Sequence, residues 1–318
     1  MSRIMQIAEY LSTKTGKSFH DIESLISNAP RMYKVYRIPK RTSGYRVIAQ
    51  PSKVIKSLQR HAVEILRAYL PIHPCAMAYQ KGKDIKLNAQ IHSKNEYILK
   101  MDFEDFFNSI NPELFKKRLN LDGIFFNTQD INLLVKLLFW NPSKRKNGKL
   151  ILSVGAPSSP LISNYIMYRF DCAIEEYCKK ENITYSRYAD DITFSTLKKG
   201  QLFIIPDIVN KILKKNSYKR ISIKLSKTIF SSKAHNRHVT GVTLNNNGEI
   251  SIGRARKRML SSLIFQATCG ELDKDDISSL KGQLGQAFYI DSTFQNSMHK
   301  KYGIDIINKI IGENSEKA

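Results

Sequence analysis

Alternating apolar and polar residues predict the first strands of this chain. Residues 33–38 and 46–49 alternate in this way, and residues 39–44 between them are rich in turn formers, so we expect a β-hairpin. Residues 5–25 instead carry apolar side chains at helical spacing, which predicts a helical cap at the N-terminus. The chain therefore begins with helix and continues into strand.

The same periodicities alternate through the rest of the chain. Strands are expected over residues 97–102, 183–188 and 192–195, and two more on either side of a turn at residues 245–248. Helices are expected over residues 52–70, 132–140, 160–178 and 205–215, and from residue 255 onward. Hydrophobic patterning alone thus predicts an α+β protein.

Acidic residues interrupt two of these strand patterns. Asp190 and Asp191 fall at the expected tip of a hairpin, where an ordinary turn is the alternative explanation because Asp is a favoured turn residue. Asp102 ends the earlier strand, so two strands could bring three carboxylates together. Mg²⁺ prefers hard oxygen ligands, and two such ions can clamp the attacking and leaving oxygens of a phosphoryl transfer. The three residues are a candidate nucleotidyl-transfer centre.

Composition points to a polyanionic partner. The 318 residues carry a formal net charge of +23, with a pI near 9.8, and phosphate neutralisation suits such a surface. An anionic membrane is the rival partner, but no apolar run is long enough to span a bilayer, and the N-terminus lacks a signal-peptide core. We expect a cytoplasmic protein that does not bind membranes, long enough for two or three subdomains.

Positive charge is concentrated in two stretches. Residues 31–67 contain ten lysines or arginines and one acid, and residues 211–258 contain thirteen and one. Solvated surface is the alternative, but the tyrosines among these cations favour nucleic acid, because rings stack on bases. The four cysteines lack Cys-x-x-Cys spacing, so neither a zinc site nor a disulfide framework is predicted.

Five short motifs, in the order of a known family, give this chain its resemblance to reverse transcriptases. Residues 102–110, 155–160 and 188–191 (Tyr-Ala-Asp-Asp) resemble three palm motifs of these enzymes. Residues 88–92 (Asn-Ala-Gln-Ile-His) and 239–241 (Val-Thr-Gly) resemble elements of bacterial retron reverse transcriptases. The resemblance runs from about residue 31 to the C-terminus. At Val154 the chain differs from the family, in which Gln is usual at this position.

The resemblance implies a right-hand polymerase fold. Its palm would be a split βαβ antiparallel sheet backed by helices. The expected division is an N-terminal cap over residues 1–30, fingers with part of the palm over 31–100, palm with a finger insertion over 101–245, and a helical thumb over 246–318. No further carboxylate set for a nuclease is expected after the thumb, so a host ribonuclease H would remove template RNA.

The resemblance also assigns the metal centre. Asp102 and Asp190 would bridge two Mg²⁺ ions, for which Mn²⁺ can substitute, and Asp191 would be the third carboxylate. Lys227 matches a fourth palm motif, where it could protonate or neutralise the leaving pyrophosphate.

Other residues are assigned to the incoming deoxynucleotide. Arg46 is the favoured contact to the triphosphate, because a guanidinium fork suits phosphate oxygens, and Lys40 and Arg41 are weaker candidates. The backbone at Asp105 and Phe106, together with Gly155, would also meet the nucleotide, although the Phe106 side chain is expected in the core. Phe107 matches the aromatic gate that blocks a ribose 2′-hydroxyl, with a core position as its alternative.

RNA contacts are expected in two regions. Asn88 and His92 would position RNA or a neighbouring loop, and His92 is not expected to be catalytic. Val239, Thr240 and Gly241 would begin a strand leading into the thumb, where the cognate RNA is recognised. Arg254 and Arg256 follow as further RNA ligands, and His235 and His238 are expected to face RNA rather than metal.

The function implied is RNA-directed DNA synthesis of the retron type. Such an enzyme binds a dedicated noncoding RNA, starts from a guanosine 2′-hydroxyl, and makes branched RNA-linked single-stranded DNA (msDNA). Retrons serve in phage defence, normally with a separate effector protein. Two alternatives remain open: a reverse transcriptase of intron or abortive-infection type, and an RNA-binding scaffold that restrains an effector.

Overall fold

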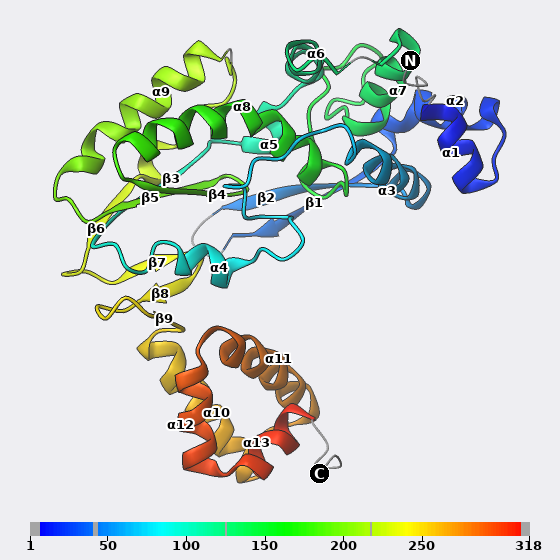
Figure 1. The fold of residues 1–318 in the computed structure, drawn as a ribbon. Coiled ribbons are helices and arrows are strands. Elements are labelled where there is room, and N and C mark those ends of the chain that lie inside the picture. Colours follow the sequence, from blue (N-terminus) through cyan, green and yellow to red (C-terminus); the bar gives the residue numbers. More distant parts are fainter. Residues whose placement is uncertain (1–6, 41–43, 125, 217, 313–318) are drawn as a thin grey trace. The chain divides into compact units, whose positions relative to one another are not determined.

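The structure is a computed structural model of the chain, and it describes residues 7–40, 44–124, 126–216 and 218–312 (Figure 1). Its contacts define two compact units. Unit 1 comprises Met1–Lys81, Met101–Ile192 and Phe203–Thr228, and unit 2 comprises Gly82–Lys100, Thr193–Leu202 and Ile229–Ala318. The boundaries expected for fingers, palm and thumb remain a prediction.

Unit 1 begins with packed helices. Helices α1 (Ile7–Thr15) and α2 (Phe19–Asn28) pack on each other and on α7 (Thr128–Leu138), and α1 also packs on α3 (Lys53–Leu66). Gly16 separates α1 from α2 because it adopts φ +66°, and Ser18 then caps α2 by accepting the Asp21 N–H. The predicted helical character of this stretch is confirmed for its described residues, as two helices, and its role as a cap remains a prediction.

The predicted hairpin forms an antiparallel ladder. Strands β1 (Tyr33–Pro39) and β2 (Tyr45–Pro51) pair from Tyr33 opposite Pro51 to Pro39 opposite Tyr45, and the short helix η1 (Ala29–Arg31) precedes them. Tyr33 and Ala49 are the strand residues that enter a small apolar cluster with Trp140 and Ala156. Most other side chains of the hairpin are exposed.

A four-stranded sheet carries the residues of chemical interest. Its order is β4 (Thr184–Tyr188), β5 (Asp191–Thr196), β3 (Tyr97–Asp102), β6 (Ile229–Ser232), and the boundary between the units passes through β3 and β5. Helix α8 (Ser159–Lys180) packs on β4, and α9 (Ile205–Lys215) and α6 (Pro112–Leu121) pack on α8 (Figure 1). Three short helices lie next to these strands in the chain: α5 (Phe106–Ser109) after β3, η2 (Gln201–Ile204) after β5 and η3 (Leu225–Lys227) before β6.

Unit 2 combines a small sheet with a helical bundle. Helix α4 (Ile85–Gln90) packs on the sheet of β7 (Arg237–Val239), β8 (Val242–Leu244) and β9 (Ile250–Ser251). The bundle consists of α10 (Arg254–Thr268), α11 (Lys274–Ile290), α12 (Ser292–Tyr302) and α13 (Ile304–Ile311). One apolar core joins both parts, from Ala89 and Val239 to Leu284 and Ile307.

The α+β prediction is confirmed, with one local correction. We expected Val239, Thr240 and Gly241 to begin a strand, but Val239 ends β7, and Thr240 and Gly241 form the turn into β8. Both turn residues have positive φ, +47° and +82°, which no strand accommodates. Across the described part of the chain, no helix is both long and apolar enough to cross a membrane.

Candidate active site

The ends of two strands bring the three predicted carboxylates together in unit 1. Asp102 is the last residue of β3, and the neighbouring Phe103 N–H donates to the Asp190 carbonyl at 3.1 Å. Ala189 turns the chain between β4 and β5 with φ +57°, and Asp191 begins β5. The expected hairpin tip is thus a tight turn held against the end of β3.

The electrostatics of this cluster are unfavourable without a cation. Burial raises the pKa of Asp190, and the Asp102 charge raises it further. Asp191 keeps an exposed surface, yet loss of surrounding water, the charges of Asp190 and Asp102, and a hydrogen bond with Asp102 raise its pKa to about 7. Asp190 and Asp191 therefore resist being ionised together, as expected where a divalent cation binds.

Lys227 supplies one positive charge. Its Nζ lies 2.8 Å from Asp102 Oδ2, and the hydrogen bond raises the pKa of the lysine. The Lys224 N–H also donates to the Asp102 carbonyl at 2.7 Å, so the segment carrying Lys227 is fixed to the end of β3. The pKa values of Asp190 and Asp191 stay raised despite this ammonium, so negative charge remains, and hard oxygen donors of this kind suit Mg²⁺ or Mn²⁺.

A second group of possible metal ligands lies outside this cluster. His73, Cys75 and Glu175 place one ligand atom each within 4.8 Å of one another. The Cys75 thiol donates to Glu175 at 3.0 Å, and His73 Nδ1 accepts the Cys75 N–H at 3.3 Å. That second bond leaves the ring proton on Nε2, the atom that faces Glu175. Hydrogen bonds therefore account for this group.

Arg46 is a predicted triphosphate ligand whose charge acts on one of the carboxylates, Asp190. It is exposed on β2, and its charge acts to lower the pKa values of Asp190 and Tyr79. Lys40 is exposed at the end of the hairpin, where its N–H donates to the Gly44 carbonyl at 2.9 Å. Arg41 lies outside the described residues.

Gly155 lies where its loop meets strand β2. Its φ is +121°, and a Cβ there would come within 3.0 Å of Ile48 Cγ2 and 3.2 Å of the Ala49 carbonyl, so any larger residue would force the loop away. The carbonyl of Val154 accepts the Ala49 N–H at 2.9 Å. The presence of Val154, where Gln is usual in the family, therefore changes a side chain and leaves the backbone contact in place.

Phe106 and Phe107 differ as expected. Phe106 is buried and stacks on Phe103 with ring centroids 5.6 Å apart, whereas Phe107 is only partly buried. Asp105 begins α5 with φ +41°, so the segment after β3 is a strained turn followed by a short helix. The turn directs the two rings differently and leaves Phe107 available to a ligand.

The residues of the Asn-Ala-x-x-His motif are internal. Asn88 is buried and its side chain donates to Thr240 Oγ1 at 3.4 Å; His92 is fully buried and shares a 2.7 Å hydrogen bond with Ser195. Burial lowers the pKa of His92 to about 3, so the ring is neutral. Val239 is buried as well, and the Asn88 bond to Thr240 fits the expected alternative that this motif positions a neighbouring loop.

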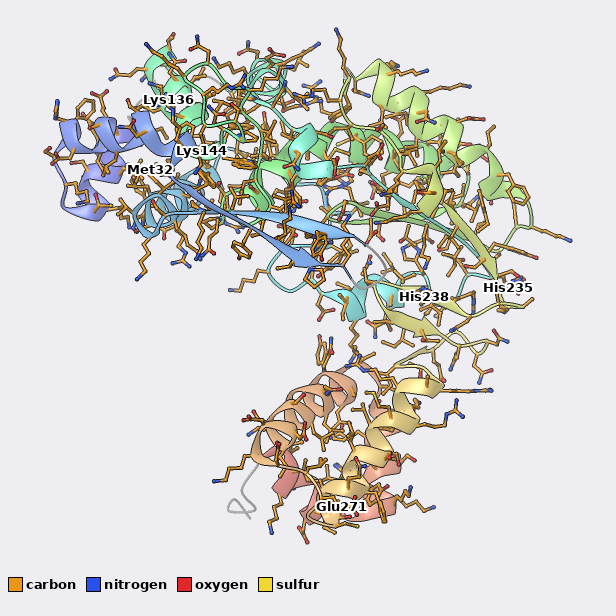
Figure 2. All side chains as sticks on the ribbon, turned by 180° about the vertical axis from the view of Figure 1, so that it is seen from behind. Met32, Lys136, Lys144, His235, His238 and Glu271 are labelled. Atoms are coloured by element: carbon orange, nitrogen blue, oxygen red, sulfur yellow. The ribbon has the colours of Figure 1, made fainter. Side chains whose placement is uncertain are left out.

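A basic cavity of about 1320 Å³ lies within unit 2. Arg254 lines it, while Arg256 lies beside it on α10 and donates to Gln286 at 2.8 Å. The other cations on its wall are Lys86, Lys94, Lys233, Lys257 and Arg258. His235 also lines it, and both His235 and His238 are exposed where Figure 2 labels them. The concentration of cations suits a phosphate backbone.

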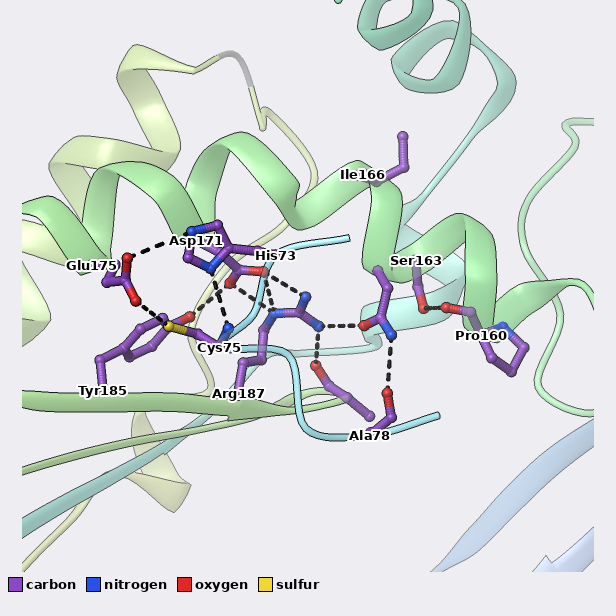
Figure 3. Close-up of polar contacts among 12 residues, drawn as sticks. His73, Cys75, Ala78, Pro160, Ser163, Ile166, Asp171, Glu175, Tyr185 and Arg187 are labelled. Atoms are coloured by element: carbon purple, nitrogen blue, oxygen red, sulfur yellow. Dashed lines mark hydrogen bonds and ion pairs between the residues drawn. The ribbon is translucent and has the colours of Figure 1, made fainter. Parts of the chain in front are cut away.

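Sequence analysis missed a buried polar network behind the carboxylate turn (Figure 3). Arg187 of β4 is fully buried and pairs with Asp171 of α8 at 2.6 Å. Its other contacts reach Asn164 and the carbonyl of Ala189. The only signal in the sequence was a charged residue at an inward-facing strand position two residues before the Ala-Asp-Asp turn.

Comparison with known proteins adds independent information. A family model described as reverse transcriptase (RNA-dependent DNA polymerase) matches residues 38–244. The retron Ec83 reverse transcriptase of Escherichia coli is 47% identical over 301 residues, which cover 94% of this chain and 96% of that protein. The retron Ec73 reverse transcriptase of the same species is 32% identical over 291 residues, covering 88% and 90%.

A solved structure shares the fold. Apo telomerase from Candida tropicalis superposes with a TM-score of 0.51 at 12% identity, over 91% of this chain and 60% of the telomerase chain. At that identity the likeness concerns the fold alone.

Proposed function

The chain belongs to the reverse transcriptase family and is a bacterial retron reverse transcriptase, an RNA-directed DNA polymerase; from this premise we propose that it copies one cognate structured noncoding RNA. Synthesis would start from a guanosine 2′-hydroxyl in that RNA and give branched, RNA-linked single-stranded DNA. Residues 31–100 would form the fingers with part of the palm, 101–245 the palm with its finger insertion, and 246–318 the thumb. A role in phage defence with a separate effector protein, within the cytoplasm, completes the proposal.

The observation that carries the chemistry is a cluster of three acidic side chains whose negative charges repel one another. Asp102, Asp190 and Asp191 would hold two Mg²⁺ ions, with Mn²⁺ as a substitute. When bound, the ions supply activation of the primer hydroxyl and charge neutralisation at the triphosphate. The raised pKa values of Asp190 and Asp191 support this role, because a bound cation offsets both the burial and the mutual repulsion that raise them.

The surrounding residues would bind and select the nucleotide. Arg46 would contact the triphosphate with Lys40 and Arg41 near it, and the backbone at Asp105, Phe106 and Gly155 would approach the same group. Lys227 would neutralise the leaving pyrophosphate, since its ammonium already lies on Asp102. These assignments place positive charge around the path of an anionic leaving group.

Recognition of the cognate RNA would involve the basic cavity of unit 2. Arg254 and Arg256 begin the helix beside it, and the Thr240–Gly241 turn presents exposed backbone near the same small sheet. Asn88, His92 and Val239 would act indirectly by holding that turn. The cations of the cavity wall support a contact with the RNA phosphates.

The branched linkage tests this proposal most directly. Nucleic acid purified with the wild-type protein should change mobility after treatment with a debranching enzyme, because its DNA 5′ end is joined to RNA through a 2′,5′ bond. Exchanging residues 236–258 for those of a relative should redirect synthesis to the relative's RNA while activity on a generic annealed template survives. A linear product with an ordinary 5′ end would overturn the priming proposal; a branched product with unchanged RNA choice would refute only the recognition role.

Nucleotide selection has its own test at Phe107. We expect Phe107→Ala to raise ribonucleotide incorporation relative to deoxynucleotide incorporation by about tenfold or more, since one lost steric contact is worth about 1–3 kcal/mol. Single-nucleotide extension with each triphosphate measures the ratio. Phe106→Leu is the matched control, because it perturbs the buried neighbour without opening the site. An unchanged ratio in Phe107→Ala would assign this ring to packing.

A further inference from the structure

Arg187 is a charged residue in the interior of unit 1. Its Nη2 lies 2.6 Å from Asp171 Oδ2 and its Nε 2.9 Å from Asp171 Oδ1, and both side chains are 0% exposed. A buried ion pair of this kind adds little net stability, because desolvation offsets the attraction. It does fix the guanidinium in one orientation, since the two bonds to Asp171 are parallel.

The remaining donor of Arg187 points at the carboxylate turn. Its Nη1 donates to the Ala189 carbonyl at 3.1 Å and to Asn164 Oδ1 at 2.9 Å (Figure 3). Ala189 is held at φ +57°, a left-handed conformation that a residue with a Cβ adopts at an energetic penalty. The peptide that Arg187 holds is the one that leads into Asp190.

Asn164 extends the same network to a second strained residue. Its Nδ2 donates to the Ala78 carbonyl at 3.0 Å, and the next residue, Tyr79, has φ +64°. The Met77 N–H also donates to the Arg187 carbonyl at 2.7 Å. Burial raises the pKa of Tyr79, and the Asp190 charge raises it further, which places the tyrosine near the carboxylates.

We propose that Arg187 and Asn164 are positioning residues, which together hold the Asp190 turn and the Tyr79 loop in one fixed arrangement at the active site. Strained backbone persists where the surrounding structure over-determines it, and here one buried pair bonds the peptides preceding both Tyr79 and Asp190. Its relevance to catalysis rests on the function proposed above; the positioning itself does not.

Two buried arginines allow a matched test. Arg118 of α6 is also buried, at 1% exposed, and lies over the Tyr218 ring at 5.1 Å. Arg187→Lys keeps the charge but not the fork that bonds Asp171, Asn164 and Ala189 at once. Arg118→Lys makes the same chemical change but leaves the hydrogen bonds of Arg187 to Asp171, Asn164 and Ala189 in place.

Hydrogen–deuterium exchange of the full-length protein reads out the positioning without any ligand. We expect amides of residues 76–80 and 188–192 to exchange about fivefold to tenfold faster in Arg187→Lys, as for the loss of about 1 kcal/mol of hydrogen bonding. In Arg118→Lys these segments should match the wild type. Asn164→Ala is the second variant: should Arg187→Lys fail to fold, it should still speed exchange at residues 76–80.

Metal binding and turnover then test whether the arrangement serves the active site. In both network variants we expect the affinity for Mn²⁺ and kcat each to fall about tenfold. Loss of the electron paramagnetic resonance signal of the free ion measures the Mn²⁺ affinity. The KM for deoxynucleotides should change less than kcat. Unchanged exchange at both segments would overturn the positioning role, and altered exchange with wild-type Mn²⁺ affinity and kcat would overturn its catalytic relevance. Absence of Mn²⁺ binding by the wild type would instead count against the proposed metal centre, and exchange would still decide the positioning role.

Discussion

Two acidic centres of this protein balance their charges in opposite ways. In unit 1, loss of surrounding water and the charges of Asp190 and Asp102 raise the pKa of Asp191 to about 7, although the Lys227 ammonium lies on Asp102. In unit 2, Asp291 is also buried, yet its pKa falls to about 2. Burial favours a raised pKa at Asp291 too, but the hydrogen bonds that it accepts outweigh that effect.

The number of donors explains the difference. Asp291 accepts bonds from Lys257 Nζ at 2.7 Å, Thr293 Oγ1 at 2.7 Å, Ser251 Oγ at 2.8 Å and the Phe294 N–H at 2.9 Å. It thereby joins α10, β9 and the start of α12, which is a structural task that needs no ligand. The carboxylates of unit 1 are under-compensated by the protein itself. A deficit of positive charge marks a binding site, whereas a satisfied acid marks a structural one.

The largest effect is expected at the under-compensated centre. Asp190→Asn or Asp191→Asn should lower DNA synthesis by about 10³-fold or more, because a metal ion contributes several kcal/mol to the transition state. RNA binding should persist, since the basic surfaces are unchanged. Primer extension measures DNA synthesis, and filter binding measures RNA binding. Asp207→Asn, on the exposed first turn of α9, is the control. If both active-site variants retain DNA synthesis, the assignment of Asp190 and Asp191 as metal ligands is wrong.

A smaller effect of a different kind is expected at the satisfied centre. Asp291→Asn should lower the free energy of unfolding by about 2 kcal/mol, because it leaves Lys257 beside a neutral side chain and weakens four hydrogen bonds. Urea denaturation measures the change. Asp275→Asn, an exposed acid on α11, should stay within about 0.5 kcal/mol of wild type. Equal stability of the two variants would contradict the contrast between the centres.

The pH dependence of stability should have opposite signs at the two centres. In metal-free protein between about pH 4 and 7, folded Asp191 keeps a proton that the unfolded chain releases, so its contribution to stability falls as pH rises. Asp291, with its lowered pKa, contributes stability above about pH 4 that is lost as pH falls toward 2.

Asp191→Asn should therefore raise the free energy of unfolding of the metal-free protein, relative to wild type, by more at pH 7 than at pH 5. We expect about 1 kcal/mol, a value discounted for solvent screening at this exposed carboxylate. Denaturation at the two pH values, with and without Mg²⁺, measures it. A stabilisation that is the same at both pH values would argue against a raised pKa at Asp191.

Local sequence determined many of the elements and indicated a candidate centre. Helix α9 begins and ends where its apolar spacing predicted, and β3, β4 and β5 follow the predicted patterns. Asp102, Asp190 and Asp191 stood out as candidate metal ligands because they interrupt apolar strand patterns, although an ordinary turn could also explain Asp190 and Asp191. The identification of a reverse transcriptase of the retron type, made from these motifs, is confirmed by the relatives. These features depend on residues close together in the chain.

Tertiary structure decided which polar residues are buried and what holds the turn. Nothing near His92 in sequence shows that it pairs with Ser195, 103 positions away, or that it is internal. Lys227 reaches Asp102 across 125 positions, and Arg187 is fixed by Asp171 and Asn164 on another element. Burial and pairing arise only when distant segments meet, because the free energy of a buried charge depends on its neighbours in space rather than in sequence.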